Sequence, residues 1–132
     1  MIEIQRILCP IDFSDYSRHA LDHAVALARW YESTITVLHV FSTVPVAAYA
    51  GMQGFEPIAL TRADRDQLLE ELKRFVEPES APGVSMDATI CEGDTTIEIL
   101  NQATAMKAEL LVMGTHGRSG FERFLLGSVT EK

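Results

Sequence analysis

The chain has 132 residues, 47% of them hydrophobic, which is enough for one domain with its own core and too little for two ordinary domains. Its 19 acidic and 11 basic residues give a formal net charge of −8. This balance argues against DNA, RNA or an anionic membrane surface as a partner, because each of them binds clustered Lys and Arg side chains.

The first predicted unit is a β-α-β segment. Runs of β-branched and aliphatic residues at 6–11 and 34–41 predict two strands. The helix between them should begin near Ser14 and Asp15, whose short polar side chains suit a cap. Its apolar residues recur at helical spacing and should form one face that packs on the sheet: Ala20, Leu21, Ala24, Val25, Ala28 and Tyr31.

The rest of the chain continues this alternation. Residues 42–59 are rich in Pro, Gly and small residues and are predicted to form a loop or lid. A second helix should end near Glu77, because Pro78 and Pro82 cannot continue it. Its apolar face consists of Leu68, Leu69, Leu72, Phe75 and Val76. The remaining predicted elements are a strand at about 86–91, a helix at about 95–107 and a strand at 109–113.

The order β-α-β-α-β-α-β, with strands that are apolar on both faces, predicts a parallel sheet covered by helices on each side. Because crossovers between parallel strands are right-handed, the predicted fold class is α/β, a doubly wound, mostly parallel, Rossmann-like sheet. Residues 1–132 should form this single domain.

Two further features predict the cellular compartment. The first six residues lack the basic-then-apolar order of a signal peptide, and no apolar run approaches the ~18 residues of a membrane span. Cys9 and Cys91 both lie in apolar runs, which favours buried free thiols over a disulfide or redox pair. We therefore expect a soluble cytoplasmic protein.

In an open parallel sheet, ligands bind beyond the carboxyl ends of the strands, at the point where the strand order reverses. The residues that directly follow predicted strands are therefore candidate site residues. They are Pro10, Ile11 and Asp12, then Val40 and Phe41, then Glu92, Gly93 and Asp94, and finally Met113 with the segment after it.

The segment after the fourth strand carries an unusual glycine pattern. It reads Gly114-Thr115-His116-Gly117, then nine residues, then Gly127-Ser128-Val129. Glycines at a strand exit and a helix start let backbone N–H groups approach an anion that a Cβ would block. The Ser128 hydroxyl is suited both to cap the last helix and to donate to a phosphate oxygen. The spacing matches neither the P-loop nor the G-x-G-x-x-G fingerprint.

This pattern resembles the G-x2-G-x9-G-[ST] motif of the ATP-binding branch of the universal stress protein family. Gly114, Gly117, Gly127 and Ser128 match it without a gap, and the opening run 7–14 resembles the first strand of that family. The resemblance covers essentially the whole chain. It implies an adenine nucleotide alpha hydrolase-like fold and ATP as the ligand, with Mg²⁺ or Mn²⁺ to neutralise the phosphates.

The resemblance also implies roles for individual residues. Asp12 would contact the adenosine, Val40 would line the adenine pocket, and the apolar wall would be completed by Pro10, Ile11 and Met113. The ribose and phosphates would be held by Gly114, Gly117, Gly127, Ser128 and Val129, with His116 in the same loop.

Each assignment has a structural alternative. The alternative for Asp12 is a turn or helix cap, and for the glycines it is turn formation, but the complete motif favours ligand contact for both. For His116, the role of a hydrogen-bonding loop residue is favoured over contact with a phosphate. His19 and His23 have the spacing of paired metal ligands, but the residues between them lack the glutamate of a zinc protease motif. No metal site formed by protein side chains is therefore predicted.

The predicted function is that of a nucleotide-binding regulatory protein of the stress response, in which ATP occupancy changes the loops and thereby the affinity for a partner. A slow ATPase or a nucleotidyl-transfer enzyme is the alternative. At most weak ATP hydrolysis is expected and no catalytic residue is assigned, because the sequence offers no clear water-activating base beside the glycine motif. An interaction module without nucleotide is a second alternative, against which Gly127 and Ser128 argue.

The end of the chain affects the expected assembly. The sequence stops at Lys132, about one turn into the helix that Ser128 begins, whereas the family continues into a fifth strand. We therefore expect the family's last strand to be absent and the fourth strand to form a sheet edge. Such an edge invites pairing, so a second copy in a homodimer, or another partner, is expected to cover it.

Overall fold

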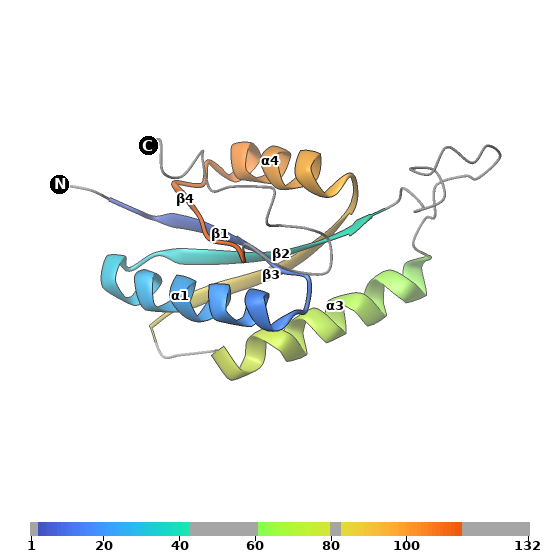
Figure 1. Ribbon diagram of the computed structural model, residues 1–132, viewed down its shortest axis with the longest axis horizontal. Helices are drawn as coiled ribbons and strands as arrows, with labels where there is room; N and C mark the ends of the chain where they lie inside the picture. The colour runs from blue at the N-terminus through green and yellow to red at the C-terminus, as the bar shows by residue number, and fades with distance from the viewer. Residues whose placement is uncertain (1–2, 43–60, 80–82, 115–132) are drawn as a thin grey trace.

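The described residues form three layers, with one parallel sheet between helices (Figure 1). The structure is a computed structural model that describes residues 3–42, 61–79 and 83–114. Helices α1 and α3 cover one face of the sheet and α4 covers the other. The strand order is β3-β2-β1-β4, and every pairing is parallel. The predicted α/β, doubly wound class is confirmed.

The observed elements follow the predicted order along the chain. They are β1 Arg6–Pro10, α1 Asp15–Tyr31, β2 Thr34–Ser42, α3 Arg62–Val76, a 3-10 turn Glu77–Glu79, β3 Ser85–Gly93, α4 Thr95–Met106 and β4 Leu110–Leu111. Of the described helices, none combines the length and apolarity needed to cross a bilayer. The predicted loop at 42–59 lies outside the described residues, apart from Ser42, which ends β2.

Each helix starts at a side-chain cap. The side chains of Ser14, Thr61 and Asp94 accept hydrogen bonds from the backbone N–H groups three residues further on, in α1, α3 and α4 respectively. A cap of this kind stabilises a helix by roughly 1 kcal/mol, because it satisfies an N–H group that has no partner within the helix. Short polar side chains therefore set where these helices begin, and for α1 and α4 they lie close after a strand.

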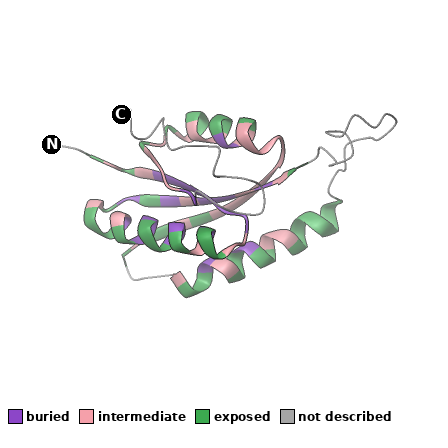
Figure 2. Cartoon of the chain, in the orientation of Figure 1, coloured by how far each residue is buried: buried purple, intermediate pink, exposed green. Residues whose placement is uncertain are grey.

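The core consists of two clusters, one on each face of the sheet, and buried residues run along the two central strands (Figure 2). Neighbouring residues of β1 alternate between them, so that Ile7 and Cys9 pack under α1 and α3 while Leu8 packs under α4. Strands buried on both faces explain why their sequences are almost continuously apolar. Cys9 and Cys91 are free thiols, and Cys9 is fully buried.

The end of α3 agrees with the expectation, since the helix stops at Val76 with Glu77 as its C-cap. The chain then continues through Pro78 in a 3-10 turn, because a proline in a first turn removes no helical hydrogen bond. One element differs from the expectation. The fourth strand was expected over 109–113, yet only Leu110–Leu111 have strand geometry. Single backbone hydrogen bonds extend its pairing with β1 by one residue on each side, at Glu109 and Val112.

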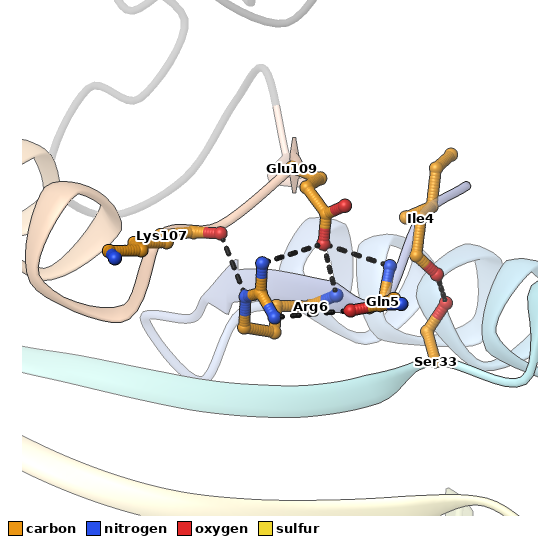
Figure 3. Close-up of polar contacts among 6 residues, drawn as sticks. All are labelled: Ile4, Gln5, Arg6, Ser33, Lys107 and Glu109. Carbon is orange, nitrogen blue, oxygen red and sulfur yellow. Dashed lines mark hydrogen bonds and ion pairs between the residues drawn. The ribbon is translucent and has the colours of Figure 1, made fainter. Parts of the chain in front are cut away.

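A polar network at the amino end of the sheet compensates for this short strand (Figure 3). Glu109 Oε1 accepts hydrogen bonds from the backbone N–H groups of Gln5, at 2.9 Å, and of Arg6, at 3.0 Å. The Arg6 side chain donates from Nε to the Lys107 carbonyl at 2.9 Å, and its Nη2 lies 3.4 Å from Glu109 Oε1. Charge-assisted bonds of this type help hold β4 in register with β1.

Candidate functional site

The strand order reverses at β1. From β1 the chain proceeds to β2 and then β3 on one side, and it returns through α4 to place β4 on the other side of β1. In an open α/β sheet, a ligand crevice is expected at such a reversal point, beyond the carboxyl ends of the two strands, here β1 and β4. Asp12 follows β1 at this point, and Met113 and Gly114 follow β4.

Asp12 is a buried carboxylate that organises the turn between β1 and α1. It is only 4% exposed. Its Oδ1 accepts hydrogen bonds from the Ser17 hydroxyl at 2.7 Å and from the Ser14 N–H at 3.0 Å. The structural alternative for Asp12 is therefore present in part, because Asp12 forms the turn while Ser14 caps α1. Contact with a ligand by the same carboxylate remains a prediction.

Side chains already occupy several N–H groups at the start of α1. The Asp12 N–H donates to Ser17 Oγ at 2.9 Å, the Ser14 N–H donates to Asp12 Oδ1, and the Ser17 N–H donates to Ser14 Oγ at 3.2 Å. A phosphate would have to displace these partners in order to use the same donors. The start of α1 is therefore better suited to the nucleoside part of a ligand than to its phosphates.

Gly114 lies against the first turn of α1. A Cβ built on Gly114 would come within 3.0 Å of Tyr16 Cβ and 3.1 Å of the carbonyl carbon and oxygen of Tyr16. Ordinary contacts between carbon atoms are about 3.5–4.0 Å, so a side chain here would push the two segments apart. In the described residues, this glycine provides room for the close approach of β4 to α1.

The apolar residues predicted for the site gather near the same edge. Val40 and Met113 belong to one core cluster under α4 and are 9% and 6% exposed. Pro10 and Ile11 are fully buried, with Ile11 in the cluster under α1. All four are covered largely by protein. Their contact with an adenine ring remains a prediction.

Most of the glycine motif lies outside the described residues. This applies to the predicted site residues His116, Gly117, Gly127, Ser128 and Val129. The structure therefore brings Asp12, Val40, Met113 and Gly114 to one end of the sheet, and Gly114 is the one residue predicted to hold ribose and phosphates that falls within the described ranges.

The exit of β3 has a structural role in the described part of the chain. Asp94 Oδ1 accepts the Ile97 N–H at 3.1 Å and so caps α4, and the Glu92 carboxylate pairs with Arg65 of α3. Gly93 has φ 145°, a conformation that favours glycine, and a Cβ there would lie 2.7 Å from Glu98 Oε1, so the Glu98 side chain would have to move.

Sequence reasoning missed three residues around Asp12. Phe13 adopts a left-handed backbone with φ 66°, Ser17 is buried and hydrogen-bonds to Asp12, and the His39 ring approaches both Ile11 and Phe13. The run Asp-x-Ser-x-x-Ser at 12–17 is a signal for an Asx turn followed by a helix cap, and it would have identified Ser17. No pattern within the strand could have paired His39 with Phe13.

Two other features lie away from the crevice. A hollow of about 520 Å³ opens between α3 and the first half of the edge strand β3, where it is lined by Lys73, Val76 and Met86 among others. His19 and His23 are exposed on α1. Within the described ranges, no three His, Cys, Asp or Glu side chains are grouped in a way that could hold a metal ion.

Comparisons with known proteins give a consistent result. The profile of the universal stress protein family matches residues 3–132. A universal stress protein of Methanocaldococcus jannaschii is 33% identical over 129 residues, which is 97% of this chain and 74% of that protein.

Solved structures agree with this match. A crystal structure of a universal stress protein family member from Burkholderia pseudomallei superposes with a TM-score of 0.69 at 27% identity, over 95% of this chain and 90% of that one. Another universal stress protein, solved in complex with cAMP, superposes with a TM-score of 0.55 over 83% of this chain and 72% of its own. At 18% identity, this last likeness concerns the fold alone.

Proposed function

The chain belongs to the universal stress protein family, and on this premise we propose that it is an ATP-binding regulatory protein of the stress response. In this proposal, ATP occupies the crevice between the carboxyl ends of β1 and β4, and occupancy changes the affinity for a protein partner. The observation that carries the proposal is the position of Asp12 and Gly114, which follow the two strands at which the order reverses.

The described residues fit the nucleoside end of such a ligand. The buried Asp12 carboxylate is an acceptor suited to nucleoside hydroxyl or amino groups, and Val40 and Met113 supply an apolar floor. The phosphates would fall to the backbone and hydroxyl groups of the glycine motif, with Mg²⁺ or Mn²⁺ bound through the phosphates. The universal stress protein solved with cAMP supports an adenine nucleotide as the ligand class within this fold.

The test is isothermal titration calorimetry with ATP and Mg²⁺, with GTP and cAMP as competing ligands. Asp12→Asn keeps an oxygen that can cap the turn but removes the charge, so it should weaken ATP binding by about tenfold or more. Asp94→Asn is the matched control, because the Asp94 carboxylate also accepts a backbone N–H after a strand, but at β3, away from the reversal point. The control should bind ATP as the unchanged protein does.

A second variant tests the glycine motif directly. Gly117→Val combined with Ser128→Ala should abolish ATP binding, because it blocks and removes the groups assigned to the phosphates. The proposal fails if the unchanged protein does not bind ATP, a result that would favour a nucleotide-free interaction module. Phosphate release measured on the same samples separates simple binding from weak hydrolysis.

We also propose a cytoplasmic location and a second copy of the chain, or another partner, along β4. Among the described strands, β4 has a neighbour on one side only. An open strand edge pairs readily with another chain. Light scattering after size-exclusion chromatography, with and without ATP, tests this part. A monomer at all concentrations would exclude the homodimer.

A further inference from the structure

Phe13 has an unusual backbone conformation beside the proposed ligand carboxylate. Its φ is 66°, in the left-handed region that favours glycine and asparagine. It is the central residue of an Asx turn, because the Ser14 N–H donates to Asp12 Oδ1 at 3.0 Å. The conformation of Phe13 therefore determines how the Asp12 carboxylate is held.

Two rings from other elements pack against Phe13. The His39 ring of β2 lies 4.7 Å from the Phe13 ring between centroids, and the Phe75 ring of α3 meets it edge-on at 5.6 Å. His39 Nδ1 is 2.9 Å from the Ile11 carbonyl oxygen, so His39 also contacts the backbone just before Asp12. The Phe13 side chain is thus fixed from β2 and from α3 at once.

The Phe75 ring is itself held in place by α1. The Arg18 guanidinium lies 3.9 Å from the centroid of the Phe75 ring, and Nη1 donates to the Phe75 carbonyl at 2.7 Å. The same guanidinium pairs with Glu79 at 3.3 Å. These contacts join the end of α3 to the turn that carries Asp12.

We propose that Phe13 is a positioning residue for the nucleotide site, whose ring, held between His39 and Phe75, keeps its backbone left-handed and so orients the Asp12 carboxylate before the ligand arrives. This inference rests on the proposed function. A preorganised site binds its ligand more tightly, because binding does not have to include the entropy cost of ordering the site. Phe13 and α3 thereby become part of the site without touching the ligand.

The alternative is that Phe13 only fills space in the core, and one pair of substitutions separates the two roles. Phe13→Ala and Phe13→Gly both remove the ring, but only glycine adopts the left-handed conformation at no cost. If Phe13 only fills space, the Phe13→Ala variant should bind ATP at least as tightly as the Phe13→Gly variant. If Phe13 is a positioning residue, Phe13→Gly should bind ATP more tightly than Phe13→Ala. Phe13→Asn should then have an ATP affinity close to that of Phe13→Gly, because asparagine also tolerates this conformation.

The experiment measures the ATP dissociation constant of the full chain for the three variants, each shown to be folded by circular dichroism. The Phe13→Ala variant should bind ATP about fivefold or more weakly than the Phe13→Gly variant. This difference corresponds to the ~1 kcal/mol or more that a left-handed conformation costs a residue other than glycine. Glu32 is the matched control, since it has φ 57° at the far end of α1. Glu32→Gly should raise the melting temperature and leave ATP binding unchanged.

Phe75→Leu is a milder second variant, because it keeps a large apolar side chain at this position of α3. It should weaken ATP binding by about two- to threefold in the unchanged chain, by loss of the edge-on contact, and should have no effect in the Phe13→Gly background. Equal or tighter ATP binding by Phe13→Ala than by Phe13→Gly would overturn the inference while leaving the proposed function intact. An unchanged protein that does not bind ATP would overturn both.

Discussion

The close approach of Gly114 to α1 makes a quantitative prediction for Gly114→Ala. The added methyl group would lie 3.0–3.1 Å from the Cβ and carbonyl atoms of Tyr16. Most of these atoms belong to the backbone of the first turn of α1, which is held in place by the Ser14 cap and by the hydrogen bond of Asp12 to the Ser14 N–H. The first turn of α1 must therefore move by a few tenths of an ångström, which would distort these hydrogen bonds.

Two opposing effects determine how much Gly114→Ala changes the free energy of unfolding. Overpacking of this kind costs about 1–3 kcal/mol. Replacing glycine by alanine regains about 0.4–1 kcal/mol, because the unfolded chain becomes less flexible. The net loss should be near 1 kcal/mol. With an unfolding entropy of about 2.1 cal/mol/K per residue, this lowers the melting temperature of a chain of this length by roughly 3–4 °C.

Thermal denaturation followed by circular dichroism, together with ATP titration, measures both consequences. Gly83→Ala is a suitable control, because a Cβ at Gly83 meets nothing within 4 Å and the cost arises from its φ of 84° alone. The control should lower the melting temperature without affecting ATP binding, whereas Gly114→Ala should reduce both. A Gly114→Ala protein that melts and binds ATP as the unchanged protein does would refute the spatial argument.

Three further predictions follow from the described contacts. Glu109→Ala should destabilise the fold by about 1–2 kcal/mol in urea denaturation, because two backbone N–H groups lose their acceptor. Burial raises the pKa of the Cys9 thiol to about 12, and burial, with the carboxylate of a neighbouring glutamate, raises the pKa of Cys91. A thiol reagent near neutral pH should therefore react slowly, and with the half-buried Cys91 before the fully buried Cys9. The hydrogen bond that protonated Glu79 donates to Asp22 raises the pKa of Glu79 above its ordinary 4.5. This contribution to stability is therefore complete below pH 4.5 and is lost as pH rises through the raised value, and Glu79→Gln should remove the dependence from a pH series of urea denaturations.

Much of the fold could be predicted because it depends on local patterns. The helical spacing of Ala20, Leu21, Ala24 and Val25 correctly predicted the buried face of α1, and Ser14 correctly predicted its start. Alternating helices and strands, together with right-handed crossovers, restrict the sheet to few arrangements. The limits of β4 were less predictable, because its short pairing depends on Glu109 and Arg6, which are more than a hundred residues apart.

The site was only partly predictable for a related reason. The sequence pattern identified Asp12 and Gly114 as residues after strands, and the structure brings both to the reversal point of the sheet. It could not reveal that Gly114 packs on Tyr16, or that Phe13 is left-handed between His39 and Phe75. These facts depend on distances between segments that are remote in sequence, and periodicity within one element contains no such information.

The double use of Asp12 is consistent with the chemistry of a carboxylate. An ionised carboxylate accepts about four hydrogen bonds, and Oδ1 receives two here, from Ser14 and Ser17. Under the proposed function, these two hydrogen bonds would favour ligand binding by fixing the orientation of the carboxylate. It follows that substitutions of Ser17 should affect ATP affinity as well as stability. A Ser17→Ala variant that loses stability but keeps its ATP affinity would show that the cap and the ligand use the carboxylate independently.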